Sequence, residues 1–205
     1  MNLIGFMGQA GSGKDTAADY LVKYYDFIRV AAADAMKEDL CCYLDMDLKT
    51  LEQYKNAKLA LVDDSSRNSD LRYVNPIGTF SIRRFLQIYG MDMRHRMHNN
   101  YWLERSIQEK IHELNSNGHT NIVISDIRFR NEFDYVKTEG RMFFIEGRSI
   151  LENEQAEHIS ESFVNDSHSK VLCDAVLDNS SNIPHLYKQL DEIMNEKYIK
   201  VISTT

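Results

Sequence analysis

A glycine-rich run near the start of the chain constrains the fold more than any other feature. The run Gly8–Thr16, GQAGSGKDT, follows a short apolar segment at 2–6 and precedes a segment with helical spacing of apolar residues. It matches the pattern G-x-x-x-x-G-K. Glycines let successive backbone N–H groups point inward, and the start of a helix adds its positive end. The run therefore predicts a strand, a phosphate-binding loop and a helix, with Lys14 reaching the β- and γ-phosphates of a nucleotide.

The residue after this lysine departs from the usual pattern. Ser or Thr normally stands there, and its hydroxyl binds Mg²⁺. Here Asp15 follows Lys14, and Thr16 comes next. Two interpretations stay open: Asp15 holds the metal through a water molecule, or Thr16 acts on a phosphate. The departure weakens the metal assignment and leaves the phosphate assignment unchanged.

Strand and helix patterns alternate about five times along the chain, which favours one α/β domain with a parallel sheet and helices on both faces. We expect strands at 2–6, 27–31, 121–126, 142–145 and 174–178. We expect later helices at about 34–44, 49–61, 79–97, 101–114, 131–138 and 184–198, with Thr79 or Ser81 capping the third of these. The stretches 35–118 and 148–170 do not fit this alternation, so we expect them to be insertions that cover a substrate.

Composition narrows the class of protein. A net charge of −7 disfavours a general nucleic-acid binder but allows one phosphorylated small molecule in a local basic pocket. The sequence contains no apolar run near the ~18 residues of a membrane span and no signal-peptide pattern at its N-terminus. Its three cysteines are too few and too badly spaced for a disulfide framework or a zinc site. We expect a cytoplasmic protein.

A second candidate lies at the end of the apolar segment NIVISD. Asp126 ends this predicted strand, and ligands in open α/β sheets lie beyond the carboxyl ends of the strands. Asp126 is therefore expected to order Mg²⁺, although a helix N-cap is the alternative. Arg128 and Arg130 follow, and either cation can stabilise charge on a transferring phosphoryl group.

The helix predicted at 79–97 carries a third candidate set. Arg83 and Gln87 are four residues apart and share one helix face, and Arg84 is three residues from Gln87. An arginine can hold a phosphate bidentately, and an amide can read the edge of a base. A solvated polar face explains the same spacing equally well. We expect Trp102 to pack in the core rather than to stack on a base.

Taken together, these segments resemble the deoxynucleoside monophosphate kinases of bacteriophages. GSGKDTAADYL, AAADAMKEDL, SIRRFLQIYGMDM, NYWLE, VISDIRFRNEFD, EHISES and DAVLDNSS follow in the family's order and cover most of the chain. The S-G-K-D-T form is usual in that family. The resemblance implies a P-loop kinase fold with a helical monophosphate-binding insertion and a short lid. It implies transfer of the γ-phosphoryl group of ATP to a dNMP, with Mg²⁺, giving dNDP and ADP.

The resemblance also implies roles for single residues. The expected catalytic residues are Lys14, Asp126 and Arg128, with Asp15 and Asp126 at the metal. The expected ATP-binding residues are Gly8, Ala10, Gly11, Ser12, Gly13, Lys14, Asp15, Thr16 and, near the adenine, Asn179. The expected dNMP-binding residues are Asp34, Lys37, Arg83, Arg84 and Gln87, and the expected lid residues are Arg148 and Glu161.

Two other functions stay open at this point. One is another P-loop small-molecule kinase, of the dephospho-CoA or phosphomevalonate type. The other is a non-catalytic nucleotide-binding switch, although the sequence lacks the N-K-x-D motif that GTP switches use to read guanine. If the chain is a dNMP kinase, we expect ATP and a dNMP as partners, no nucleic acid polymer and no membrane. A homodimer is compatible with the sequence.

Overall fold

A computed structural model describes residues 1–54, 58–60, 79–147 and 162–202. The chain divides into two compact units. The first unit joins Met1–Ala32 to Leu103–Thr205, and the second is the segment Ala33–Trp102 between them.

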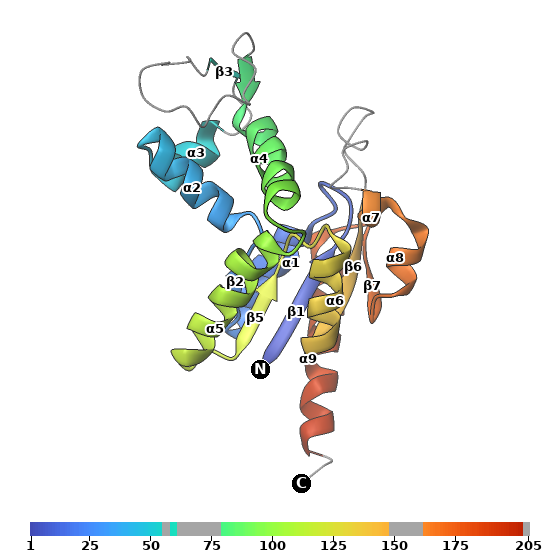
Figure 1. The fold of residues 1–205 in the computed structure, drawn as a ribbon. Helices are drawn as coiled ribbons and strands as arrows, with labels where there is room; N and C mark the ends of the chain where they lie inside the picture. The colour runs from blue at the N-terminus through green and yellow to red at the C-terminus, as the bar shows by residue number, and fades with distance from the viewer. Residues whose placement is uncertain (55–57, 61–78, 148–161, 203–205) are drawn as a thin grey trace. The chain divides into compact units, whose positions relative to one another are not determined.

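The first unit is built on a five-stranded sheet in the order β2-β5-β1-β6-β7 (Figure 1). Every pairing in it is parallel, which confirms the predicted fold class. The strands are β1 (Asn2–Met7), β2 (Ile28–Val30), β5 (Asn121–Ile124), β6 (Arg141–Gly147) and β7 (Ala175–Asn179). Because β1 is central, the glycine-rich run leaves the middle of the sheet at its carboxyl edge.

Alternate residues of each central strand enter two separate cores. On β1, Leu3 and Met7 pack into one core, while Ile4 and Phe6 pack into the other. The first core is covered by η2 (Leu103–Gln108, a π-helix), α5 (Glu109–Ser116) and α6 (Arg130–Glu139). The second is covered by α1 (Lys14–Tyr25) and α9 (Ile183–Ile202). Burial on both faces explains why these strands are almost continuously apolar.

Helices dominate the second unit. Its elements are α2 (Asp34–Leu44), α3 (Leu48–Tyr54), α4 (Ile82–Arg96) and the short antiparallel pair β3 (Lys58–Ala60) and β4 (Thr79–Ser81). Its core joins Leu40, Leu51, Ile82 and Leu86. Trp102 is fully buried and donates its indole N–H to the carbonyl oxygen of Gly90 at 2.9 Å. The expectation that this tryptophan packs in the core is confirmed.

Two predicted helices of the second unit are too long. The helix expected at 49–61 ends at Tyr54, and Lys58–Ala60 instead pairs as a strand with Thr79–Ser81. The helix expected at 79–97 begins at Ile82, because the three residues before it belong to that strand. Ser81 is its N-cap and accepts a hydrogen bond from the backbone N–H of Arg84 at 3.2 Å. A three-residue strand is too short to show its own period in the sequence.

The boundary of the second unit also differs from the predicted insertion 35–118. The unit ends at Trp102, because Leu103, Ile107, Ile111 and Leu114 are buried in the core of the first unit. The helix expected at 101–114 is a π-helical stretch that continues as α5 to Ser116. Within the predicted lid 148–170, two short helices are described, α7 (Ser162–Asn165) and α8 (Ser167–Val171). None of the helices in the described ranges has the length and apolar character that a membrane span requires.

Candidate active site

The phosphate loop (Gly8–Thr16) joins the end of β1 to the start of α1. Gly13 stands directly before α1 with φ of 104°, a conformation that glycine adopts without strain. Gly13 is the N-cap residue of α1 and has no side chain to accept from the first N–H groups of the helix, which point out of its N-terminus. The Lys14 ammonium donates to the carbonyl oxygens of Gly8 at 2.7 Å and Gln9 at 2.8 Å. The loop thus gathers N–H groups and one cation, the chemistry that phosphate requires.

The loop is seated on the ends of β6 and β7. The Asn179 amide donates to the carbonyl oxygen of Ser12 at 2.9 Å. A Cβ atom at Gly8 would collide with the carbonyl oxygen of Ile145, and one at Gly13 would collide with the Asn179 amide. Asn179, which the resemblance implied near adenine, therefore holds the loop backbone in this structure.

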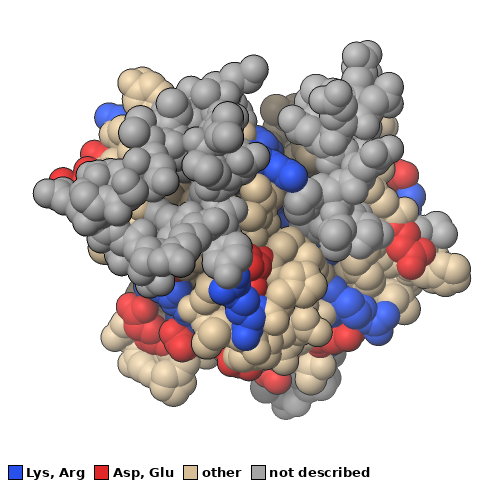
Figure 2. All heavy atoms as spheres, turned by 45° about the horizontal axis from the view of Figure 1, so that its top comes forward, with Lys and Arg blue, Asp and Glu red and all other residues tan. Residues whose placement is uncertain are grey.

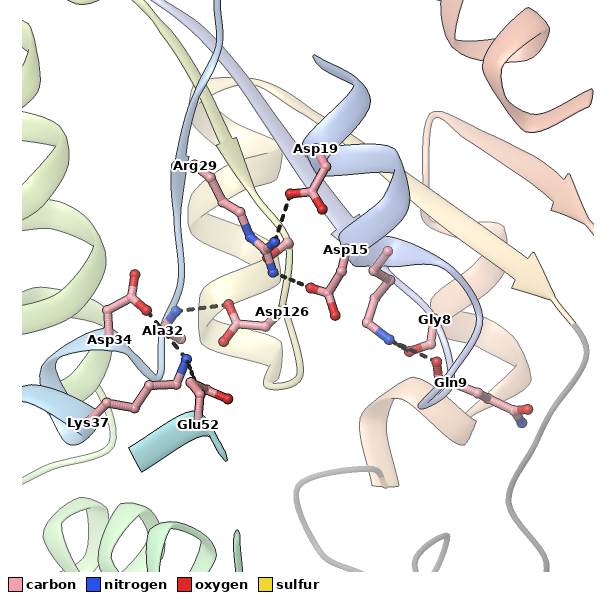
Figure 3. Close-up of polar contacts among 12 residues, drawn as sticks. Gly8, Gln9, Asp15, Asp19, Arg29, Ala32, Asp34, Lys37, Glu52 and Asp126 are labelled. Carbon is pink, nitrogen blue, oxygen red and sulfur yellow. Dashed lines mark hydrogen bonds and ion pairs between the residues drawn. The ribbon is translucent and has the colours of Figure 1, made fainter. Parts of the chain in front are cut away.

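A carboxylate stands at the end of β5, next to β1. Gly5 pairs with Ile124, so β1 and β5 run in parallel and leave the sheet at the same edge. The half-buried Asp126 follows β5 and accepts a hydrogen bond from the backbone N–H of Ala32 at 2.8 Å (Figure 3). Asp126 does not cap α6, whose N-cap is Phe129. The carboxylate instead fixes the last residue that precedes the second unit in the chain.

Arg29 is a site residue that the sequence reasoning missed. Its guanidinium donates to the Ser125 hydroxyl at 2.8 Å, to Asp19 at 3.1 Å and, in a short contact, to Asp15 (Figure 3). Asp15, one of the two expected metal residues, is therefore ion-paired with an arginine from β2. An arginine inside the predicted apolar strand FIRVA was the available signal, because a charged side chain there requires a partner.

Glu132 fixes the segment that carries Arg128. Its carboxylate is 1% exposed and accepts hydrogen bonds from the backbone N–H groups of Arg128 at 3.0 Å and Phe129 at 3.1 Å. These bonds supply partners to N–H groups at the start of α6. Arg130, by contrast, lies on the surface and pairs with Asp134 at 2.7 Å along the same helix. Arg128 is half-buried, so of these two arginines it is the one that the fold anchors.

A cavity of about 220 Å³ lies beside the phosphate loop. Gln9 and Ser12 of the loop line one side, Glu146 and Gly147 at the end of β6 line another, and Lys170 of α8 contributes a cation. Lys170 is paired with Glu146 at 2.6 Å, so these two charges cancel, and Asp166 is a further acidic residue of the lining. Asp178 lies on β7, and hydrogen bonds from Ser180, which follows the strand, hold the pKa of Asp178 below its usual range. Asp178 therefore remains a carboxylate beside Asn179 at neutral pH.

The second unit contains all five residues expected to bind a dNMP. Asp34 and Lys37 lie on α2, 3.8 Å apart, and Lys37 also pairs with Glu52 at 2.9 Å. On α4, Arg83 and Gln87 are half-buried, while Arg84 is exposed. The predicted spacing of Arg83 and Gln87 on one helix is confirmed. Their role toward a substrate stays a prediction, and Arg148 and Glu161 lie outside the described residues.

The carboxylates near the phosphate loop fit a Mg²⁺ ion that is bound partly by the protein and partly by substrate phosphates. Among the described residues, no group of three or more His, Cys, Asp or Glu side chains could hold a metal ion. Mg²⁺ usually keeps several waters and binds through one or two carboxylates together with substrate phosphates. The half-buried Asp126 beside the loop meets that requirement. Asp15 meets it less well, because Arg29 already occupies its carboxylate.

Two solved structures share this fold. Dephospho-CoA kinase from Campylobacter jejuni aligns with a TM-score of 0.53 and 12% identity, over 95% of this chain and 96% of that one. TT1252 from Thermus thermophilus aligns with a TM-score of 0.50 and 17% identity, over 95% and 97%. Identities this low show the P-loop kinase fold and carry no information on the substrate.

Comparisons of the sequence say more about the family of this chain than the two structural comparisons do. The family model for deoxynucleotide monophosphate kinase matches residues 43–190, which include α4, β5 and β7. A protein of Acanthamoeba polyphaga mimivirus, provisionally named a deoxynucleotide monophosphate kinase, is 30% identical over 193 residues. That alignment covers 93% of this chain and 94% of the relative, and so it reaches beyond the family match. This chain therefore belongs to the deoxynucleotide monophosphate kinase family of enzymes.

Proposed function

We propose that this enzyme transfers the γ-phosphoryl group of ATP to a deoxynucleoside 5′-monophosphate, giving dNDP and ADP. The observation that carries the proposal is the phosphate loop at the central strand, with Lys14 in it and Asp126 at the end of the neighbouring strand. One strand thus delivers the N–H groups and the cation, and the next delivers a carboxylate. Family membership supports a deoxynucleotide as the acceptor.

The reaction requires positioning and charge neutralisation rather than covalent catalysis. Lys14 moves from the loop carbonyls that it contacts at 2.7 and 2.8 Å to the β- and γ-phosphates of ATP. Arg128, whose backbone N–H donates to Glu132, is the cation that we propose stabilises the charge that develops on the transferring group. The acceptor phosphate is already ionised, so the attacking oxygen requires no general base.

Asp126 is the residue that would hold Mg²⁺, through water or directly, and Asp15 is the second candidate. When bound, the ion neutralises charge on the β- and γ-phosphates. Asp126 has a further task in this chain, because its carboxylate also fixes Ala32. Removing the carboxylate would therefore affect both the phosphates and the segment that leads into the second unit.

We propose that the second unit binds the acceptor. Arg83 would contact the phosphate of the dNMP and Gln87 its base, since both are half-buried on one helix of that unit. We propose small molecules as substrates rather than a nucleic acid polymer. The net charge of −7 supports this, as does the interspersed distribution of basic and acidic side chains in the view of Figure 2.

The test is formation of ADP by purified protein with ATP, Mg²⁺ and a panel of dNMPs and NMPs. Dephospho-CoA and phosphomevalonate serve as competing acceptors, and ATP alone measures hydrolysis. We expect ADP only when a dNMP is present, with the corresponding dNDP as second product. Turnover of either competing acceptor in preference to every nucleotide would overturn the proposal, as would binding of ATP without turnover of any acceptor.

A further inference from the structure

The residue after the P-loop lysine poses an electrostatic problem. Asp15 adds a negative charge in the first turn of α1, next to Lys14 and to the loop that we propose binds triphosphate. Asp19 adds a second, one helical turn further on. Both carboxylate side chains are largely exposed, at 74% and 70%. Like charges repel, so an unpaired Asp15 would oppose the binding of phosphate.

Arg29, which pairs with both carboxylates, lies on β2, the edge strand next to β5. Its guanidinium reaches both carboxylates, and its Nε–H donates to the Ser125 hydroxyl at 2.8 Å. Ser125 is 1% exposed, so this third bond is made inside the protein and fixes the direction of the guanidinium. Figure 3 shows the Arg29 side chain directed between Asp15 and Asp19. The three bonds use the Nε and both terminal nitrogens of one planar group, a fixed geometry that the compact ammonium of a lysine does not have.

We propose that Arg29 is a positioning residue that holds the Asp15 carboxylate and neutralises it, so that an acidic residue can stand in the phosphate loop without repelling ATP. Asp15 is then a partner of Arg29 rather than a direct metal ligand. This inference rests on the proposed binding of ATP by the loop. It adds a residue from β2 to a site otherwise built on β1, β5, β6 and β7.

The test is the affinity for ATP without an acceptor, measured by calorimetry with and without Mg²⁺. Arg29→Met leaves Asp15 unpaired, and we expect the Kd of free ATP to rise about tenfold, as one uncompensated charge a few ångströms from a phosphate would produce. The Kd of MgATP should rise less, because the metal already cancels part of the phosphate charge. Arg96→Met is the matched control, since it breaks the 2.8 Å pair with Asp92 on α4, and it should change neither constant.

A second substitution separates neutralisation from simple structural support. Asp15→Asn removes the charge that Arg29 neutralises, so Asp15→Asn alone and Asp15→Asn combined with Arg29→Met should have Kd values for ATP within twofold of each other. Asp19→Asn should rescue less, because Asp19 lies one turn further from the loop. If Arg29→Met does not fold, Arg29→Lys with and without Asp15→Asn gives the same comparison with a smaller shift.

Each result of these binding measurements either supports the proposal about Arg29 or contradicts it. Rescue by Asp15→Asn supports the proposal. If Arg29→Met raises the Kd of ATP equally with and without Asp15→Asn, the proposal is overturned, and Arg29 only supports the fold. Equal Kd shifts for ATP and MgATP would overturn it as well. If the unmodified protein binds no ATP, the proposed function fails first, and that result is distinct from the others.

Discussion

The phosphate loop and helix α4 present their candidate substrate groups in different ways. In the loop, the proposed contacts to phosphate are backbone N–H groups, and residues from three strands hold the loop through Asn179, Arg29 and the close approach of Ile145. On α4, the candidate groups are side chains on one regular helix. A backbone site requires glycines at fixed spacing, so it leaves a strong sequence pattern. A side-chain site on a helix requires only a polar face, which a solvated helix has as well.

The loop should tolerate less change than α4, and Lys14→Ala tests this with the largest expected effect. Loss of the ammonium removes a charge that we propose acts on the transferring group, and it should lower kcat/KM about 10²- to 10³-fold. The fold should persist, because the contacts of Lys14 are made with carbonyls of its own loop. Steady-state ADP formation and thermal denaturation are the measurements. Lys110→Ala, which removes a 2.8 Å surface pair with Glu113, is the control, and a similar rate for both variants would contradict the loop assignment.

Asp126 tests whether the strand-end carboxylate acts on phosphate or only on the chain. Asp126→Asn keeps an oxygen for the Ala32 N–H but removes the charge. We expect kcat to fall up to roughly 100-fold, with a higher Mg²⁺ requirement, as for other residues that organise a metal. Asp126→Ala also removes the hydrogen bond and should in addition lower the melting temperature. The Mg²⁺ dependence of kcat and the melting temperature are measured for both. If Asp126→Asn retains full activity, the carboxylate has only the structural role.

Arg83 and Gln87 test the α4 side of the comparison. Arg83→Ala should lower kcat/KM for every dNMP by about 10- to 30-fold, since a half-buried charge-assisted hydrogen bond contributes about 1.5–2 kcal/mol. The Kd of ATP should not change. Gln87→Ala should change the ranking of the bases more than the overall rate, because an amide carries no charge. Kinetics with each dNMP at saturating ATP gives both results. Equal losses for ATP and all dNMPs would make α4 a structural support.

The contrast between the glycine-rich loop and the polar face of α4 also explains which parts of the fold could be predicted from the sequence. The five strands and the order of elements followed from long apolar runs that alternate with helical spacing, and the sheet confirms them. The phosphate loop was predicted from the spacing of its glycines and Lys14. The strand Lys58–Ala60 did not, because three residues carry no usable period and its partner lies at Thr79–Ser81, beyond a long intervening stretch. The unit boundary at Trp102 depended on which core buries Leu103 and Ile107, which is a tertiary property.

Within the site, the sequence predicted residue types better than partners. Asp126 was placed correctly at a strand end, but its bond to Ala32 joins residues 94 positions apart. Asp15 was considered as a metal residue because of its position after Lys14, and its ion pair with Arg29 on β2 was not visible in the sequence. Asn179 was expected near adenine, which stays a prediction, and the hydrogen bond from its amide to the carbonyl oxygen of Ser12 was not foreseen. In each case the missing information was a long-range contact, which periodicity and motif spacing do not contain.

The smallest expected effects distinguish two amides that bond to backbone near the end of β7. Asn179 donates to the loop carbonyl of Ser12. Gln189 accepts from the backbone N–H of Asp178 at 2.9 Å and donates to its carbonyl at 2.8 Å. β7 is an edge strand, so Gln189 gives these two groups the partners that a further strand would supply. The first amide thus contacts the phosphate loop, whereas the second contacts the sheet and, at 3.1 Å, the carbonyl oxygen of His185 in its own helix.

Asn179→Ala should therefore raise the KM for ATP about fivefold, equivalent to about 1 kcal/mol for a lost hydrogen bond to the loop. Gln189→Ala should leave KM unchanged and lower the free energy of unfolding by about 1–2 kcal/mol, because two backbone groups lose their partners. Kinetics and urea denaturation are measured on both variants. A KM that rises equally in both would show that the edge of the sheet controls the loop as a whole. Unchanged KM in both would show that the glycines alone shape the loop, and that its seating on β7 does not matter for ATP.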